Sequence, residues 1–459
     1  MSDARCETVR KTWLRSARWI GLVAAIVTVL PTPVLAQEAG SNGIRFGRAR
    51  VHPFFDFFSY YQSNPGRRTN GGVSDLMLKI RPGFNLDYPG RSYEIYSSGN
   101  VEYRHFMGLN AVENSSSDTT KLSAVMGGLS VDGKFLKTSS FPLSMKVDIN
   151  RIDTPANQSQ SKTLGKNAAS MTLGSQWAPG GGALKLGLSY KPSLAIYDGN
   201  ENGSDNDNLN TLNQDTSFQA QWRFLPKTAT FIEASYRNYG YLNPEKGFSS
   251  TLGQTPNGET GTDTSTADSA QQSFNVTVPI SSAYWGLSGQ ITPRLSTIMK
   301  FGYGQTMTEN VDDSQQSSGF LTQVDIKYKS SETIKYSGGY ARSLAGAVLF
   351  QHRTTDRIYL KGQTTLARRY ALALNLEYDM IGYGDPVVTA ANGGRNDTIV
   401  RAEAVASVKI TNWFVASLVN KFETLSAKGA DGQNWELVSG SGTPSYKYND
   451  TFLRLSVRY

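Results

Sequence analysis

The sequence predicts an all-β protein, a transmembrane antiparallel β-barrel of about 18 strands, with 16 as the alternative count. Two observations carry this prediction. Apolar and polar residues alternate over many segments, as expected of strands with one apolar and one polar face. The segments are joined alternately by tight turns and by long hydrophilic loops, which is typical of bacterial membrane barrels and hard to explain for a soluble sandwich.

The first 36 residues are organised as a cleaved secretory signal peptide. Basic residues from Arg10 to Arg18 precede a mostly apolar run, and Val34 and Ala36 supply the small residues that a signal peptidase requires. The apolar run of about 12 residues is shorter than the ~20 of a spanning helix, which disfavours an uncleaved anchor. We therefore expect an exported chain with Gln37 as its mature amino terminus.

The composition of the mature chain excludes several classes of function. Its only cysteine, Cys6, lies in the signal peptide, so we expect neither disulfides nor a cysteine metal cluster. Without the five basic and two acidic residues of the signal peptide, the formal charge falls from +8 to +5. The sequence shows no phosphate loop or nucleotide site, so we expect no cofactor and no nucleic-acid partner.

The remaining chain divides into a short periplasmic segment, 37–49, and a barrel, 50–459. Eight tight connections centre near residues 89, 137, 180, 226, 293, 331, 368 and 412. Nine long ones centre near 67, 113, 158, 206, 258, 312, 348, 390 and 435. Together they give 18 strands with both ends on the periplasmic side. The ambiguous phase of 117–131 and the open start of the strand within 273–291 leave 16 as the alternative.

Single strands support the barrel. Leu372, Leu374 and Leu376, for example, face away from Asn375 and Glu377. Because unpaired backbone groups are not tolerated in hydrocarbon, strands that span a membrane must close into a ring.

The carboxyl-terminal strand has an apolar face that ends on an aromatic residue. The members of this face are Leu453, Leu455, Val457 and Tyr459. The pattern resembles the closing strand of bacterial outer-membrane barrels, which the barrel-assembly machinery reads as an address. The resemblance implies a C-terminal assembly signal, that machinery as a partner, and a Gram-negative outer membrane with its lipid and lipopolysaccharide as surroundings.

The segment 284–304 resembles a known family. Its Gly286-Leu287-Ser288-Gly289 strand, Thr292-Pro293-Arg294 turn and returning strand with Gly302-Tyr303 resemble the repeating hairpin of the β-barrel porin family of the second type. Segments 357–378 and 50–60 are similar to other strands of that family. Members are frequently associated with exopolysaccharide production, as proposed exit pores. The resemblance implies export of a polysaccharide and a periplasmic polysaccharide-export component as partner, and it carries no catalytic residues.

The strand phases direct many charged residues inward. The basic residues singled out as pore-lining are Lys146, Lys185, Arg223, Arg237, Lys300, Lys327, Lys361, Arg401, Lys409 and Arg454. The acidic ones are Glu102, Glu233, Glu377 and Glu403. The same faces also carry Lys79, Arg81, Arg104, Lys191, Lys335, Arg458, Asp148, Asp325 and Asp379. Positive charges exceed negative ones in this set, and a positively lined channel concentrates anions.

These observations favour an exit pore for an anionic exopolysaccharide. Two alternatives remain: an uptake porin for small anions or oligosaccharides, and a structural or adhesive barrel with surface-binding outer loops. The inward charges could instead pair with one another, for example Glu102 with Arg104 or Arg401 with Glu403. The inward aromatics Phe231, Tyr359 and Phe452 could stack on sugars or only pack.

Enzymatic chemistry is not expected. The chain has three histidines, of which His105 near the outer rim is the one catalytic candidate, and a filler at the membrane interface is the simpler interpretation. The acidic loop 198–208 could bind calcium, but a solvated loop is the simpler interpretation there too, so no metal site is predicted. The loop 248–272 could fold into the mouth as a constriction.

Overall fold

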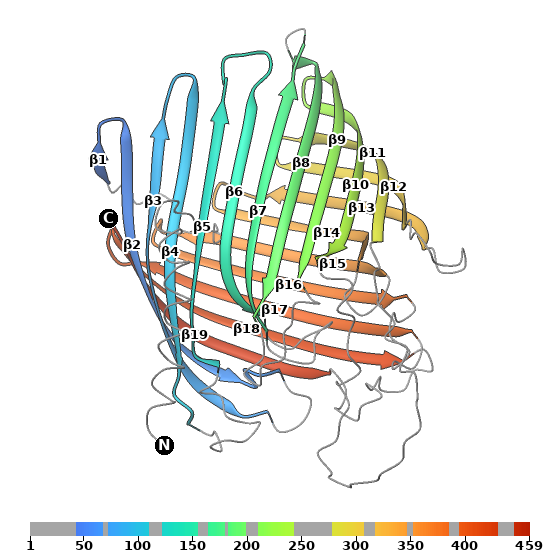
Figure 1. Ribbon diagram of the computed structural model, residues 1–459. Helices are drawn as coiled ribbons and strands as arrows, with labels where there is room; N and C mark the ends of the chain where they lie inside the picture. The colour runs from blue at the N-terminus through green and yellow to red at the C-terminus, as the bar shows by residue number, and fades with distance from the viewer. Residues whose placement is uncertain are drawn as a thin grey trace, which may run out of the picture.

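The computed structural model is a closed β-barrel (Figure 1). It describes residues 43–67, 72–109, 122–154, 164–179, 182–198, 210–242, 278–306, 317–346, 352–384, 394–429 and 445–459. Among these residues no helix is long and apolar enough to cross a membrane. The predicted signal peptide, 1–36, and the loop 248–272 lie outside the described residues.

The described residues form nineteen strands. The first ten are β1 (Ile44–Phe46), β2 (Ala49–Ser63), β3 (Ser74–Pro89), β4 (Tyr93–Phe106), β5 (Ala124–Phe135), β6 (Leu143–Thr154), β7 (Leu164–Trp177), β8 (Leu184–Tyr197), β9 (Thr211–Leu225) and β10 (Thr228–Tyr241). The others are β11 (Val278–Thr292), β12 (Leu295–Thr306), β13 (Ser318–Lys329), β14 (Ile334–Gly346), β15 (His352–Leu366), β16 (Tyr370–Tyr383), β17 (Arg395–Lys409), β18 (Phe414–Gly429) and β19 (Tyr446–Arg458).

Strands β2 to β19 form the barrel wall. Each pairs antiparallel with the next along the chain, and β19 pairs with β2, with Phe452 opposite Tyr60, which closes a ring of 18 strands. The predicted count of 18 is therefore confirmed, and the alternative of 16 is wrong. The segments 117–131 and 273–291, in which the sequence left the strand bounds open, overlap β5 and β11.

The short strand β1 was not expected. It pairs with the start of β2, with Ile44 opposite Val51, through a tight turn at Gly47. Gly47 has a φ of 62°, in the left-handed region that glycine adopts at little cost. The part of the segment 37–49 that the structure describes thus contributes a small hairpin to one rim of the barrel, beside the short turns (Figure 1).

The wall has an apolar outer face. On β16, Leu372, Leu374 and Leu376 are 44%, 47% and 39% exposed on the outside, whereas Ala371 and Ile381 on the inside are buried. Similar exposed apolar residues occur on strands all around the ring. This pattern is the reverse of that in a water-soluble protein, and an exterior of this kind requires lipid around it.

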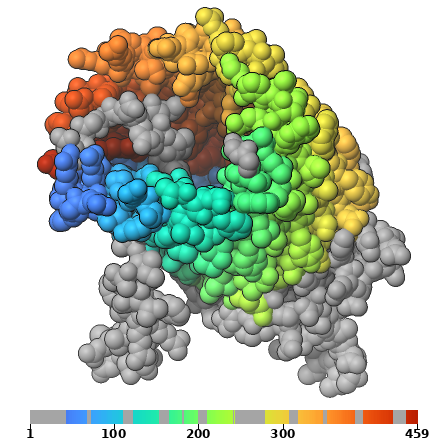
Figure 2. Space-filling view, turned by 90° about the horizontal axis from the view of Figure 1, so that it is seen from above, coloured from blue at the N-terminus to red at the C-terminus, as the bar shows by residue number. Residues whose placement is uncertain are grey.

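The wall surrounds a hollow, which is visible from the rim that carries the short turns (Figure 2). Aromatic rings cover glycines on its inner face. A Cβ at Gly286 would come within 2.4 Å of the Phe231 ring, and one at Gly302 within 2.6 Å of the Tyr284 ring. These contacts explain two of the glycines in the hairpin 284–304, since no larger residue fits beneath the rings.

Candidate functional site in the barrel lumen

The fourteen residues that the strand phases assigned to the lumen lie on the strand face opposite to the apolar outer face. Each alternates with exposed apolar residues of the outer face; Lys361, for example, follows Leu360, which is 53% exposed to the outside. The side chains that face the lumen do not behave alike, however. Some are fixed in ion-pair networks, and others have no charged partner.

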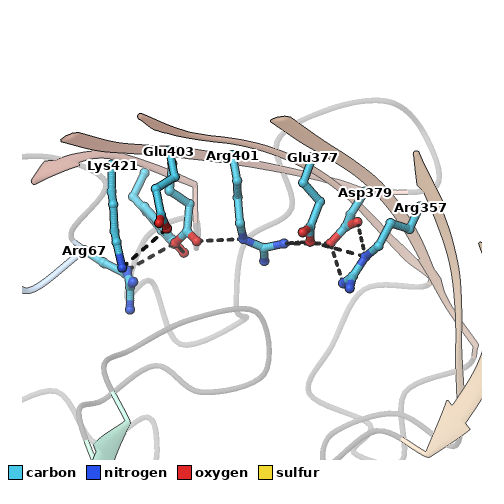
Figure 3. A network of polar contacts seen from close by, with 9 residues as sticks. Arg67, Arg357, Glu377, Asp379, Arg401, Glu403 and Lys421 are labelled. Carbon is cyan, nitrogen blue, oxygen red and sulfur yellow. Dashed lines mark hydrogen bonds and ion pairs between the residues drawn. The ribbon is translucent and has the colours of Figure 1, made fainter. Parts of the chain in front are cut away.

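An ion-pair ladder crosses four adjacent strands, β15 to β18 (Figure 3). At its centre Arg401 donates from Nη1 to Glu377 and Asp379, both at 2.7 Å, and from Nε to Glu423 at 2.8 Å. Arg357 continues the ladder, with Nε 2.8 Å from Asp379. Because Asp379 is buried, these charge-assisted bonds are the stronger kind.

The other end of the ladder is supplied by a loop. Arg67, which follows β2, places Nε 3.3 Å from Glu423. Its guanidinium also lies 5.7 and 5.0 Å from the ring centroids of Tyr446 and Tyr448. Arg67 is not predictable from the sequence pattern, because it lies beyond the strand end with a φ of 51°, where alternation predicts nothing.

A second network joins the first and last strands of the ring. Asp56 of β2 accepts hydrogen bonds from Arg81 Nη2 at 2.5 Å, from Arg454 Nη2 at 3.2 Å and from Ser456 Oγ at 2.5 Å. Its side chain is 1% exposed. Arg81 and Arg454 were predicted to face inward, whereas Asp56 was not. The signal was present, since Asp56 shares the phase of the buried Phe58 and Tyr60.

The suggested pairs within single strands are wrong. Glu102 pairs with Lys79 across strands at 3.2 Å rather than with Arg104, and Glu403 pairs with Lys421 at 3.6 Å rather than with Arg401. Lys421 lies directly opposite Glu403, where Cβ atoms are about 5 Å apart, whereas residues two apart on one strand lie about 7 Å apart. Glu102 instead reaches diagonally to Lys79, the residue opposite Arg104. At these two positions the ion pair therefore joins neighbouring strands.

Most remaining partners of the predicted residues lie on the same or neighbouring strands. Lys146 pairs with Asp148 at 2.9 Å, Lys300 with Glu233 at 3.3 Å, and Arg237 with Asp215. Lys409 also has an interaction partner. All four predicted lumen acids, Glu102, Glu233, Glu377 and Glu403, are thus engaged in ion pairs.

Four of the basic residues predicted to line the pore have no acidic partner among the described residues. Within the described part of the chain, no ion pair is formed by Lys185, Arg223, Lys327 or Lys361. Lys361 alone has an aromatic contact, with Nζ 5.3 Å from the Tyr359 ring centroid. The uncompensated charge of the lumen wall is therefore positive at these positions, and it would attract anions.

The inward aromatics pack rather than present free faces. Phe452 is 7% exposed and lies 4.3 Å from the Tyr60 ring centroid, in a buried cluster with Phe58. Phe231 is 6% exposed and covers Gly286, and the Tyr359 hydroxyl bonds to Asp325. Of the two hypotheses for these rings, the geometry favours packing over sugar stacking.

The other candidates from the sequence gain no chemical role. His105 lies at the outer rim with its ring 6.3 Å from that of Tyr103. Of the acidic loop, only Asp198 is described, and its carboxylate is 2.5 Å from Arg151; the rest of 198–208 lies outside the described residues. Among the described side chains no group of three could hold a metal ion.

Ring closure, the apolar exterior and the charged lumen define a transmembrane β-barrel of the outer-membrane type. Among solved structures, the chain is similar to OccAB4 from Acinetobacter baumannii, with 9% identity and a TM-score of 0.43 over 89% of this chain and 98% of that one. It is also similar to the FrpB iron transporter from Neisseria meningitidis, with 9% identity and a TM-score of 0.46 over 91% and 82%. For the ferric enterobactin receptor PfeA from Pseudomonas aeruginosa, the values are 8% and 0.42 over 89% and 80%. No protein-family model and no curated protein sequence matches the chain.

Proposed function

We propose that the protein is an outer-membrane channel rather than an enzyme, and that it is the exit pore for a secreted anionic exopolysaccharide. The observation that carries the proposal is the imbalance of pairing in the lumen. The four glutamates singled out as pore-lining are all in ion pairs, whereas four of the ten basic residues, Lys185, Arg223, Lys327 and Lys361, are not. Uncompensated bases in a low-dielectric lumen lower the barrier for anions and raise it for cations.

Two further features support a polysaccharide. On β8 and β9 the inward face carries Ser189, Ser217, Gln219 and Gln221, whose hydroxyl and amide groups can exchange hydrogen bonds with a hydrated sugar chain. The hairpin 284–304 resembles a family associated with exopolysaccharide production. Transport would be passive, with a periplasmic export component supplying the polymer.

Deletion of the gene tests the proposal. We expect loss of nearly all extracellular polysaccharide, together with accumulation of the same polymer in the periplasm, because the exit is closed while synthesis continues. The measurement is the mass of polymer in the medium and in a periplasmic extract. A strain carrying the gene on a plasmid is the control.

Unchanged polysaccharide in the deletion strain would contradict export. Single-channel conductance would then separate the alternatives. An anion-selective current would indicate an uptake porin for small anions or oligosaccharides, and the absence of current would indicate a structural or adhesive barrel.

The proposal includes assembly through the carboxyl-terminal strand. Leu453, Val457 and Tyr459 lie exposed on the outer face, and the Tyr459 amide donates to the carbonyl of Pro53 at 3.0 Å. Deletion of Tyr459 is expected to reduce the barrel in outer-membrane fractions severalfold, measured by its heat-modifiable gel band. Y459F should restore it, because the terminal aromatic ring is retained.

Refolding into detergent supplies the control for this prediction, since it needs no assembly machinery. The shortened chain should refold there with the yield of the intact chain. A matching loss of yield in detergent would show that Tyr459 acts through stability and not as an assembly signal.

A further inference from the structure

Four lysines gather on three adjacent strands around Ser337 of β14. Lys327 of β13 and Lys361 of β15 are the residues directly opposite Ser337. Lys335 lies two residues from Ser337 on the same strand, and Lys329 lies directly opposite Lys335. All four side chains are exposed and face the lumen, since their neighbours Ile326, Tyr328, Tyr336 and Leu360 are exposed on the outer face. These four residues form the lysine cluster.

The lysine cluster differs from the other lumen lysines. Lys79 and Lys300 pair with Glu102 and Glu233. Lys185 and Lys191 of β8 form no ion pair with a described residue, but they lie opposite Gln221 and Asp215 rather than beside further lysines. None of the four cluster lysines forms an ion pair with any described residue. Directly opposite like charges, such as Lys329 and Lys335, have Cβ atoms about 5 Å apart and are destabilising.

The groups that surround the cluster do not neutralise it. Ser296, Gln363 and Asn375, which lie opposite its members on β12, β15 and β16, are uncharged. The carboxylate of Asp325 on β13 accepts hydrogen bonds from Tyr359 and Gln323. Glu332, in the turn between β13 and β14, is exposed and forms no ion pair with the described residues. The two carboxylates offset part of the charge of the four lysines, so the cluster keeps a net positive charge that an anionic ligand would balance.

The cluster lies at the rim of short turns, since β13 ends at Lys329 and β14 begins at Ile334. In outer-membrane barrels the short turns are on the periplasmic side. A ligand of the cluster would therefore meet it on arrival from the periplasm.

From this geometry we propose that the lysine cluster is the site that receives the anionic polymer at the periplasmic mouth. This proposal rests on the proposed export function. Its ligand is a segment of polysaccharide with several carboxylate groups. Charges spread over three strands suit a row of carboxylates better than one small anion. Lysine is a point charge on a flexible stem, unlike the forked arginines fixed in the ladder, so it can hold a chain that must slide onward. Ser296, Ser337 and Gln363 can bond the sugar hydroxyls.

Binding to the purified barrel in detergent tests the proposal. The probe is hexagalacturonate, and neutral maltohexaose is the control ligand. The variant K327Q/K335Q/K361Q is expected to bind hexagalacturonate about tenfold more weakly or worse, with a shallower dependence on salt. The matched variant K185Q/K191Q/R223Q removes the same charge from β8 and β9, where these bases contribute only to the general attraction of the lumen for anions. It should therefore weaken binding by less than about threefold, since screening limits the effect of charges away from the site. The heat-modifiable gel band checks that both variants are folded.

Two results would overturn the proposal: unchanged binding by the cluster variant, or equal losses in both variants, which would mean a delocalised field and not a site. The denaturant midpoint gives an independent readout. Removing mutually repelling lysines should leave it unchanged or raise it, while a structural role would lower it. Because the binding assay does not involve export, a failed site and a failed export function are distinguishable. If the export function fails, the deletion strain secretes normally although hexagalacturonate still binds to the barrel.

Discussion

Replacement of Asp56 by alanine is expected to lower the free energy of unfolding by about 3–5 kcal/mol, the largest single-residue effect that we predict. Asp56 is the only described acid that bonds Arg81 and Arg454, and it connects β3, β2 and β19 across the closing seam. Without it two guanidinium groups remain side by side over the Phe58 ring. Urea unfolding of the barrel in lipid vesicles, followed by tryptophan fluorescence, measures the change.

Two variants separate the charge effect from a general defect. D132N changes a lumen aspartate that forms no ion pair with the described residues, and it should cost less than about 1 kcal/mol. The triple variant D56L/R81M/R454M removes all three charges and should cost less than D56A alone, because no charge is left without a partner. If D56A unfolds within about 1 kcal/mol of the wild type, the seam does not depend on this network.

Alternation predicted the barrel well because it has a direct physical cause. A strand between lipid and a wet lumen must separate its apolar and polar residues at every second position, so the phases of Leu372 and Glu377 follow from the sequence alone. The alternation of long and short connections predicted the number of strands. The strand β1 was not predicted because three residues, Ile44 to Phe46, are too few for alternation to be distinguished from chance.

Partners within the lumen were less predictable, since they depend on register. Which residue lies opposite Glu102 is decided by the length of the turn at Pro89 and Gly90, and a shift by one would turn every side chain to the other face. The inward direction of Asp56 could have been predicted, because the alternation along its strand gives its phase. Arg67 was not, since it enters the lumen from a loop whose path follows no periodic rule.

Replacement of Arg401 by alanine is expected to cost about 2–4 kcal/mol and to lower the anion-to-cation permeability ratio. The ladder of Arg67, Arg357, Arg401, Glu377, Asp379 and Glu423 is neutral, with three charges of each sign. Loss of its central base leaves a net negative charge on the lumen wall beside the buried Asp379. Urea unfolding measures the stability, and the reversal potential across a planar bilayer in a salt gradient measures the selectivity.

The control for Arg401 is R342Q, which removes the same charge from the outer face. Arg342 pairs with Asp356 at 3.5 Å and is 45% exposed, so its loss should cost less than about 1 kcal/mol and leave the reversal potential unchanged. R401K should fall between R401A and the wild type, because an ammonium keeps the charge but lacks the fork that reaches three carboxylates. A reversal potential that is equal in R401A and R342Q would mean that the ladder only holds the wall together. The selectivity of the lumen would then have to come from its unpaired bases, such as Lys185 and Lys327, alone.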